Sequence, residues 1–253
     1  MTFRIHREEN VLHFTINRPE IRNAINLDVM DGFEKLVTEV HNDSTIQFVV
    51  ITGEGQDAFC SGGDLSTFHG LKTAQEAFPM LDRMATALYQ LATLPVPVIA
   101  LVNGHAVGGG CEIATACDFR IVASHAKCGF IQGSLAITSG WGGGTYLIEK
   151  LARQDLALKM LCEAKPLPAQ NLLENGWATQ IYDGDKNQAL QTFLVEMKQV
   201  EASVHRAYKQ MLIRKWTNQK LVDHIKEEVK ICANLWEAEE HHEAVQKFLA
   251  RKK

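Results

Sequence analysis

The chain has 253 residues, of which 46% are hydrophobic and 22% charged, and its formal net charge is −4. This composition is ordinary for a globular protein of one or two domains with a substantial core. The negative net charge disfavours a nucleic-acid partner, no apolar run reaches membrane-spanning length, and residues 1–9 lack the apolar core of a signal peptide. We therefore expect a soluble, cytoplasmic protein.

The cysteines are scattered, with no CxxC pair and no histidine at zinc-ligand spacing: Cys60, Cys111, Cys117, Cys128, Cys162 and Cys232. We expect reduced thiols and no metal site. The adjacent His241 and His242 would point to different parts of a helix surface, which disfavours a metal site there too. A cysteine nucleophile at Cys60 or Cys111 is an alternative, although no histidine lies in sequence to activate either.

In chain order, residues 3–6 and 11–16 alternate as a β-hairpin around a polar turn at residues 8–10. Asn26 is a predicted N-cap for the helix that follows. The apolar positions of that helix recur at helical spacing: Val29, Met30, Phe33, Leu36, Val37 and Val40.

A buried strand is predicted over residues 46–52, followed by a first glycine turn whose sequence is Phe59-Cys60-Ser61-Gly62-Gly63-Asp64-Leu65. Taken alone, this turn could be no more than a break between elements. Asp64 is expected to fix the loop through backbone hydrogen bonds. The apolar spacing over residues 74–92 predicts a long helix, which ends before the prolines at 95 and 97.

The central stretch is residues 97–118, PVIALVNGHAVGGGCEIATACD. It predicts a strand, a sharp turn through Gly108, Gly109 and Gly110, and a helix opening at Cys111-Glu112. Free N–H groups at a helix start bind negative charge, and glycines let a ligand approach closely. A flexible turn with a surface glutamate is the simpler interpretation of this segment alone. There is no GxGxxG pattern and no phosphate-loop lysine, which disfavours nucleotide binding.

Two strand-to-glycine-turn units in one chain can each offer one backbone N–H to the same oxygen, which is how an oxyanion hole is built. Glu112 would stand beside that site.

The later elements are a strand at 119–123, a helix at 147–161, a short helix from Leu167-Pro168 to Gly176, and a final strand at 177–182. From residue 187 we expect helices with breaks near residues 202 and 217–218. One apolar stripe is predicted on the last of them: Leu221, Ile225, Val229, Cys232 and Trp236.

The ordered motifs resemble the enoyl-CoA hydratase/isomerase, or crotonase, family over essentially the whole chain. They are Asn17-Arg18-Pro19 with Asn23-Ala24, the first glycine turn, Asn103-Gly104 to Glu112, Cys117-Asp118, and Gly140-Trp141-Gly142-Gly143. The resemblance implies an α/β fold, a crotonase-type spiral of β-β-α repeats over residues 1–195. It also implies a helical C-terminal domain over residues 196–253, which completes the site of the same or a neighbouring subunit.

The resemblance further implies an acyl-CoA thioester as substrate, no separate cofactor, no metal, and assembly as a homotrimer or hexamer. It assigns the oxyanion hole to Gly63 and Gly109 and the catalytic acid to Glu112. Residues expected to contact the substrate or coenzyme A are Arg22, Ala24, Ser61, Gly62, Asp64, Leu65, Gly108, Gln132, Ser134 and Trp141. Arg22 could instead be a solvated surface residue, and Trp141 could belong to the core.

The segment after Phe130 bears on the reaction. Hydratases of this family have a second glutamate a few residues after a Phe-Gly pair. The matching stretch here is about two residues shorter and offers Gln132, Gly133 and Ser134. Hydration divides proton transfer between two carboxylates, whereas loss of CO2 needs oxyanion stabilisation and one acid. Glu112 suits that task, particularly if burial raises its pKa.

Local sequence patterns also favour decarboxylation. Residues 115–120, residues 139–143, Leu235-Trp236 and residues 243–245 resemble the branch that decarboxylates ethylmalonyl-CoA and methylmalonyl-CoA. The chain departs from that branch at Ser139, where the branch has a turn proline, and at Gly133-Ser134, where it has a charged pair. We favour decarboxylation of a short 2-carboxyacyl-CoA. Enoyl-CoA hydration or isomerisation is the alternative, and an acyl-CoA-binding scaffold without turnover is an alternative of another class.

Overall fold

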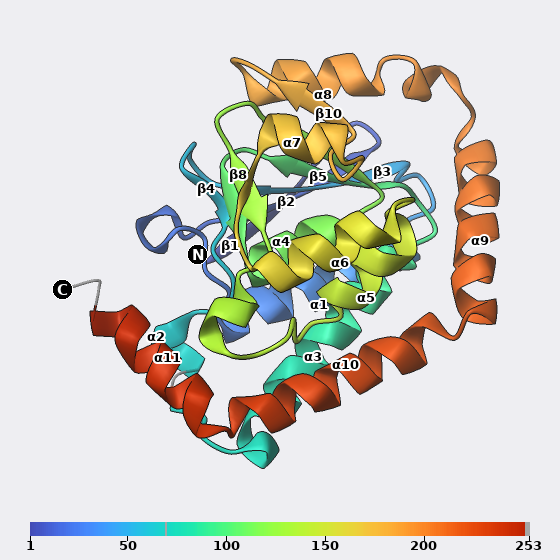
Figure 1. The fold of residues 1–253 in the computed structure, drawn as a ribbon. Coiled ribbons are helices and arrows are strands. Elements are labelled where there is room, and N and C mark those ends of the chain that lie inside the picture. Colours follow the sequence, from blue (N-terminus) through green and yellow to red (C-terminus); the bar gives the residue numbers. More distant parts are fainter. Residues whose placement is uncertain (69, 251–253) are drawn as a thin grey trace.

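The computed structural model describes residues 1–68 and 70–250. Two β-sheets form its centre, and helices surround them (Figure 1). The larger sheet has the order β1-β2-β3-β5-β7-β10, with strands β1 (Phe3–Glu8), β2 (Val11–Ile16), β3 (Phe48–Gly53), β5 (Val98–Val102), β7 (Phe119–Ala123) and β10 (Gln180–Tyr182). The smaller sheet has the order β4-β6-β8-β9, with β4 (Ala58–Cys60), β6 (His105–Val107), β8 (Lys127–Gly129) and β9 (Leu167–Pro168).

A β-β-α repeat generates this arrangement. In each repeat the first strand joins the larger sheet, the second joins the smaller sheet, and a helix follows. The repeats are β3-β4 with α2 (Leu65–Phe68) and α3 (Ala74–Ala92), β5-β6 with α4 (Gly109–Ala116), and β7-β8 with the 3-10 helix η2 (Gln132–Leu135) and α5 (Gly143–Lys150). The predicted crotonase-type spiral is therefore confirmed.

The strands of the larger sheet form where the sequence predicts β-structure, whereas the short strands of the smaller sheet were not predicted. Every residue of β3 and β5 is buried, as expected for central parallel strands that are covered on both faces. The hairpin of β1 and β2 is antiparallel. Asn26 caps α1 (Leu27–Asn42) as predicted, because its side-chain oxygen accepts the Val29 N–H at 3.1 Å.

Two sequence predictions about helices are wrong. The single helix expected over residues 147–161 is two helices, α5 and α6 (Gln154–Glu163). Leu151 leaves helical geometry, with φ −84° and ψ 125°, and becomes buried. The helix expected to open at Cys111 begins at Gly109, and the three-residue strand β6, too short to give an alternating pattern, precedes it.

The C-terminal helices are α7 (Ala169–Glu174), α8 (Lys186–Leu194), α9 (Ala202–Asn218), α10 (Leu221–Trp236) and α11 (Glu239–Ala250). The short 3-10 helix η3 (Met197–Gln199) lies between α8 and α9, and η1 (Pro19–Ile21) precedes α1. In Figure 1, α8 to α11 run from the top of the view around its right and lower sides. The predicted apolar stripe of α10 is buried, except that Trp236 is only partly so. The break between α10 and α11 was not predicted, and the domain boundary at residue 195 stays a prediction. No described helix is both long and apolar enough to cross a membrane.

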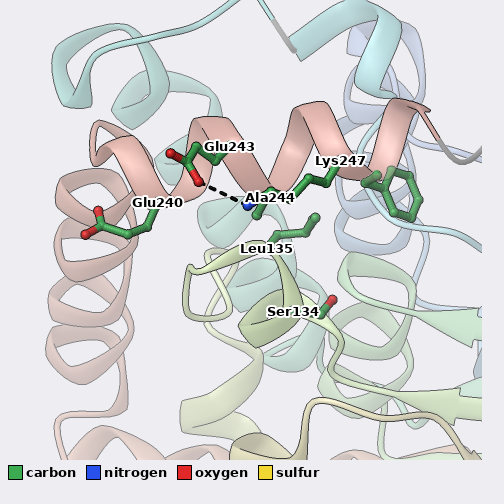
Figure 2. Close-up of a pocket in the computed structure, with 7 residues that line it drawn as sticks. Ser134, Leu135, Glu240, Glu243, Ala244 and Lys247 are labelled. Carbon is green, nitrogen blue, oxygen red and sulfur yellow. Dashed lines mark hydrogen bonds and ion pairs between the residues drawn. The ribbon is translucent and has the colours of Figure 1, made fainter.

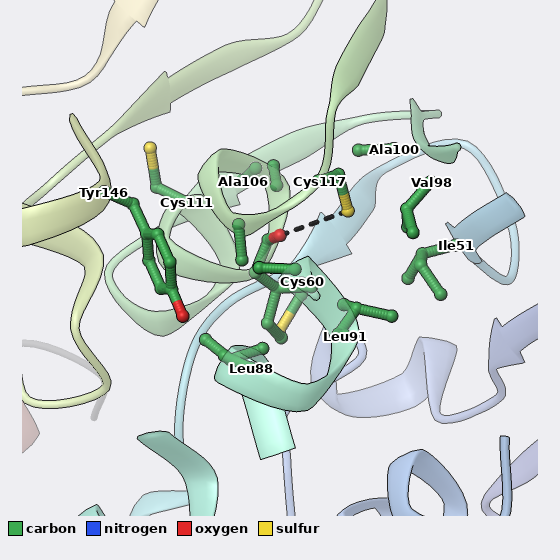
Figure 3. Packing of buried hydrophobic residues seen from close by; sticks show 14 of the residues in the cluster. Ile51, Cys60, Leu88, Leu91, Val98, Ala100, Ala106, Cys111, Cys117 and Tyr146 are labelled. Atoms are coloured by element: carbon green, nitrogen blue, oxygen red, sulfur yellow. Dashed lines mark hydrogen bonds between the residues drawn. The ribbon is translucent and has the colours of Figure 1, made fainter. Parts of the chain in front are cut away.

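The thiols near the proposed oxyanion turns are packed in the core. Figure 3 shows Cys60 and Cys111 among buried side chains, with Tyr146 nearby. Burial raises the pKa of Cys60 to about 12 and raises the pKa of Cys111 well above its ordinary value. Since the thiolate is the nucleophile, these pKa values argue against the cysteine alternative.

The C-terminal end of α4 is held by a buried lysine. Lys150 Nζ donates to the carbonyl oxygens of Thr115, Ala116 and Cys117 at 2.9, 2.7 and 3.0 Å. The last carbonyls of a helix have no partner within the helix, and a cation there also complements the helix dipole. Lys150 therefore fixes the end of α4 opposite to Glu112.

We expect Lys150→Met to lower the free energy of unfolding by about 1–3 kcal/mol, because three buried carbonyls lose their donor. Urea denaturation followed by circular dichroism measures this change. The matched control is Lys159→Met on α6, where the lysine side chain is 64% exposed. Equal denaturation midpoints for the two variants would show that Lys150 does not stabilise α4.

Candidate active site

The two glycine turns lie against each other. A Cβ atom on Gly62 would stand 3.1 Å from the backbone nitrogen of Gly109. The N–H groups of Gly63 and Gly109 have no hydrogen-bond acceptor among the residues that the structure describes. Two free amides from adjacent turns form the arrangement that an oxyanion requires.

Trp141 closes one side of these turns. A Cβ on Gly109 would lie 2.1 Å from Trp141 Cζ3, so only glycine lets the first residue of α4 approach the indole. A Cβ on Gly63 would lie 3.7 Å from the same ring. Trp141 is 4% exposed and also lines the cavity described below. Both interpretations of this residue therefore hold, since it is a core residue and a wall of the site.

Glu112 lies in the first turn of α4 and is 2% exposed. Its Oε2 accepts the backbone N–H groups of Trp141 at 2.8 Å and Gly143 at 2.9 Å. Its Oε1 accepts Gln132 Nε2 at 2.7 Å, and the Gly140 N–H is 3.4 Å away. The carboxyl group is thus held by one side chain and by the loop that begins α5.

The start of α5 must be glycine at Gly143, because a Cβ there would lie 2.3 Å from Glu112 Cγ. The N-terminal N–H groups of a helix favour negative charge through hydrogen bonds and the helix dipole. Burial nevertheless outweighs them and, with the nearby Glu228 carboxylate, raises the pKa of Glu112 to about 8. At neutral pH the carboxyl therefore carries its proton in most molecules.

Glu228 of α10 is a second buried carboxylate, which the sequence analysis missed. It accepts the N–H groups of Gly144 and Thr145 at 3.0 and 2.7 Å and the hydroxyls of Ser139 and Thr145, both at 2.5 Å. Burial raises the pKa of Glu228 as well. The adjacent amides of Gly143 and Gly144 therefore bind one carboxylate each.

A spacing signal could have identified Glu228. It stands three residues after Ile225 and four before Cys232, on the apolar stripe of α10, but its charged neighbours suggest a solvated face. Ser139, which replaces a turn proline of the decarboxylating branch, supplies the hydroxyl that Glu228 binds. That departure from the branch thus has a structural role here.

A cavity of about 800 Å³ opens beside these groups. All the residues that the sequence analysis assigned to the site line it: Arg22, Ala24, Ser61, Gly62, Gly63, Asp64, Leu65, Gly108, Gly109, Glu112, Gln132, Ser134 and Trp141. The size suits a substantial organic ligand, and the lining is mostly apolar with a few convergent polar groups. Their individual roles toward a ligand stay predictions.

Several of these residues have identifiable structural partners. Asp64 pairs with Arg18 at 2.8 Å and accepts the Ser66 N–H at 3.0 Å, which fixes the first glycine turn. Ser134 is exposed and donates its hydroxyl to the Ile131 carbonyl at 2.6 Å. Arg22 is exposed at the cavity rim with φ 56°.

Helices α10 and α11 also line the cavity, through side chains that the sequence analysis did not assign to it: Cys232, Trp236, His241, His242, Val245, Phe248 and Leu249. His241 Nδ1 lies 2.7 Å from the Leu135 carbonyl, so it joins α11 to η2, and its ring packs at a tilt against Trp236 with ring centroids 4.8 Å apart. Figure 2 shows α11 passing over Leu135 and Ser134, with Glu243 paired to Lys247 on its surface. Residues from the N-terminal and the C-terminal parts of the chain therefore line the same cavity.

We expect Glu228→Gln to lower the pKa of Glu112 by on the order of one unit, because the variant removes a like charge near it. The protonated carboxyl stretch in infrared difference spectra, titrated against pH, measures this value. The matched control is Glu227→Gln, whose side chain is 65% exposed. An unchanged titration in Glu228→Gln would mean that burial alone sets the pKa.

Comparison with known proteins shows the family to which the chain belongs. A family model described as enoyl-CoA hydratase/isomerase matches residues 6–253. The chain is 35% identical over 180 residues to a short-chain-enoyl-CoA hydratase of Clostridium acetobutylicum, covering 71% of this chain and 68% of that protein. It is 30% identical over 232 residues to an ethylmalonyl-CoA decarboxylase of Xenopus tropicalis, covering 90% of this chain and 77% of that protein.

The fold agrees with these matches. The crystal structure of an enoyl-CoA hydratase from Bacillus halodurans superposes with a TM-score of 0.88 at 18% identity, covering 98% of this chain and 100% of that chain. The fold shared with that structure carries the two glycine turns, the buried Glu112 and the cavity that these residues line. The chain belongs to the enoyl-CoA hydratase/isomerase family, and it is an acyl-CoA-processing enzyme.

Proposed function

We propose that this enzyme decarboxylates a short 2-carboxyacyl-CoA, such as ethylmalonyl-CoA or methylmalonyl-CoA, with Glu112 as the proton donor. The observation that carries the proposal is the buried carboxyl group of Glu112, which lines the cavity with a pKa of about 8 beside two unpaired amides. The group that faces Glu112 at 2.7 Å is the Gln132 amide rather than a second carboxylate. The relative named ethylmalonyl-CoA decarboxylase, which matches 90% of this chain, adds support.

The proposed chemistry uses each of these groups once. The amides of Gly63 and Gly109 bind the thioester oxygen. Cleavage of the bond between the α-carbon and the carboxylate releases CO2 and leaves its electron pair in the thioester enolate, whose oxyanion the two amides stabilise. Protonated Glu112 then gives its proton to the α-carbon and yields the acyl-CoA. Solvent restores the proton to Glu112, so one proton is consumed per turnover.

Binding of the coenzyme A portion is part of the proposal. We assign contacts with it to the rim residues Arg22, Ala24 and Ser61, and contacts with the acyl group to Leu65 and Trp141. The reaction would use no further cofactor, since coenzyme A belongs to the substrate. Assembly as a trimer or hexamer and a cytoplasmic location also stay predictions.

Hydration or isomerisation of an enoyl-CoA is the second candidate. The match to a short-chain-enoyl-CoA hydratase favours it. In that case Gln132 or Ser134 would hold the water, and Glu112 would act alone in proton transfer. An acyl-CoA-binding scaffold without turnover is the third candidate, and a measurable rate that depends on Glu112 excludes it.

We expect Glu112→Gln to lower the rate of CO2 release from ethylmalonyl-CoA by about 10²–10⁴-fold, because the general acid is lost. Mass spectrometry of the CoA products distinguishes butyryl-CoA from unreacted substrate, and crotonyl-CoA in parallel tests for gain of water. The control is Glu174→Gln, an exposed glutamate of α7. Gain of water on crotonyl-CoA without loss of CO2 from ethylmalonyl-CoA would contradict the preferred reaction.

The pH dependence separates an acid role from a base role. Since the pKa of Glu112 is raised to about 8, its acid form predominates below that pH. We therefore expect kcat/KM for decarboxylation to be level below pH 8 and to fall tenfold per pH unit above it. A kcat/KM that rises through pH 8 would identify the carboxylate as a base instead.

A further inference from the structure

Arg18 belongs to a motif to which the proposed reaction gives no role. Its side chain is 14% exposed, and it is not among the described residues that line the cavity. Its Nη2 donates to Asp64 Oδ2 at 2.8 Å, and its Nη1 donates to the Ala24 carbonyl oxygen at 2.7 Å. A charge that is largely removed from water is unfavourable unless it is paired and hydrogen-bonded, and here both conditions are met.

Asp64 connects this cation to the first glycine turn. It directly follows Gly63, whose N–H is one of the two proposed oxyanion donors. The Asp64 Oδ1 accepts the backbone N–H of Ser66 at 3.0 Å and the Ser66 hydroxyl at 2.6 Å. Although burial opposes the charge, these hydrogen bonds and the one from Arg18 hold the pKa of Asp64 below its ordinary value. The pair is therefore ionised at neutral pH.

The backbone of Ile25 determines which way the Gly63 N–H points. The Ile25 N–H donates to the Gly62 carbonyl oxygen at 2.8 Å, and the Asp64 N–H donates to the Ile25 carbonyl oxygen at 2.8 Å. The Gly62 carbonyl and the Gly63 N–H belong to one planar trans peptide, so they point in opposite directions. The hydrogen bond from Ile25 therefore directs the Gly63 N–H away from Ile25. It leaves this N–H unpaired at a residue that lines the cavity.

The segment before Ile25 needs restraint. Arg22 and Asn23 both have φ 56°, a left-handed conformation that is unfavourable for residues other than glycine. The fully buried Asn23 accepts the Arg18 N–H at its Oδ1 at 3.0 Å. The Arg18 guanidinium holds the carbonyl of Ala24, one residue before Ile25. Arg18 thus fixes the approach to Ile25 through both its backbone and its side chain.

We propose that Arg18 is a positioning residue for the oxyanion hole. Its guanidinium holds Asp64, which follows Gly63, and Ala24, which precedes Ile25. These two contacts keep the Gly63 peptide in the orientation that aims its N–H at the thioester oxygen. Arginine suits the task because its planar fork serves two acceptors at once. The inference rests on the proposed role of the Gly63 amide in the reaction.

Loss of this restraint affects the reaction more than binding. A hydrogen bond weakens steeply as its angle departs from linearity, so a turned Gly63 amide polarises the thioester less. The other contacts of the acyl-CoA lie elsewhere in the cavity and do not depend on this angle. We expect Arg18→Met to lower kcat for decarboxylation by about tenfold, with KM changed by less than about threefold.

The direct test observes the thioester carbonyl by infrared difference spectroscopy. Butyryl-CoA, isotope-labelled at that carbonyl, has no 2-carboxylate to lose, and its C=O stretch moves to lower frequency when an oxyanion hole polarises it. We expect Arg18→Met to lose about half of this shift or more. Arg18→Lys keeps the charge without the fork and should restore part of the shift. Calorimetry should show that both variants bind butyryl-CoA within about threefold of the unaltered enzyme.

A matched control and a second variant accompany the test. Arg153→Met removes an arginine that pairs with Asp155 where both side chains are more than 60% exposed, and it should keep the full shift. Asp64→Asn removes the other charge of the pair and carries the test if Arg18→Met does not fold. It should reduce the shift, and the double variant should reduce it no further than Arg18→Met, because the two groups act together. A full shift in Arg18→Met or in Asp64→Asn overturns the inference, and so does an affinity that falls as far as the shift does.

The outcomes separate this inference from the function on which it rests. No shift in the unaltered enzyme would mean that the amides do not bind the thioester oxygen, and the proposed reaction would fail with the inference. A shift that Arg18→Met retains in full would keep the function and reject the positioning role. A shift that depends on Arg18 in an enzyme that releases no CO2 would keep the positioning role and reject decarboxylation.

Discussion

The structure depends on the way the N-terminal end of α5 holds two buried carboxyl groups. Successive backbone amides of this end bind Glu112 of α4 and Glu228 of α10. Hydrogen bonds and the helix dipole favour the charged forms, while burial and mutual repulsion disfavour them, and the raised pKa of Glu112 shows that burial prevails. The contact with Glu228 also attaches α10 to the spiral. The N-terminal end of α5 therefore both sets the environment of Glu112 and holds α10 in place.

Both ends of α4 are fixed for related reasons. At its N-terminal end the Gly109 amide stays unpaired beside Trp141, and Glu112 stands one turn further on. At its C-terminal end Lys150 satisfies three carbonyls. A catalytic group functions best when the element that bears it cannot shift, because small displacements of a reacting atom reduce rate steeply. The buried Lys150 amine therefore contributes to the site by holding the far end of the helix.

The side chain that contacts Glu112 Oε1 is the neutral amide of Gln132, whereas a pair of carboxylates would place a second acid there. Two carboxylates can share the proton transfers of hydration, but they repel an anionic acyl group. An amide carries no charge that would repel an anionic acyl group. The proposed loss of CO2 needs one acid and two oxyanion-binding amides, so the preference for decarboxylation depends on this neighbour of Glu112.

Local patterns in the sequence determined the β1-β2 hairpin, the helix over residues 74–92 and the two strand-to-glycine turns, because apolar periodicity and glycine position are local properties of the chain. The β-β-α spiral and the residues that line the site followed from the ordered motifs that resemble the enoyl-CoA hydratase/isomerase family. The sequence did not reveal the interruption at Leu151 or the strand β6, since a three-residue strand and a helix break driven by burial leave no periodic signal. Only the tertiary structure decided that Glu228 meets the loop of Ser139, that α11 covers η2, and that Gln132 rather than Ser134 faces Glu112. Each of these contacts joins residues from different elements, and side-chain burial, which sets the pKa of Glu112, exists only once those elements have packed.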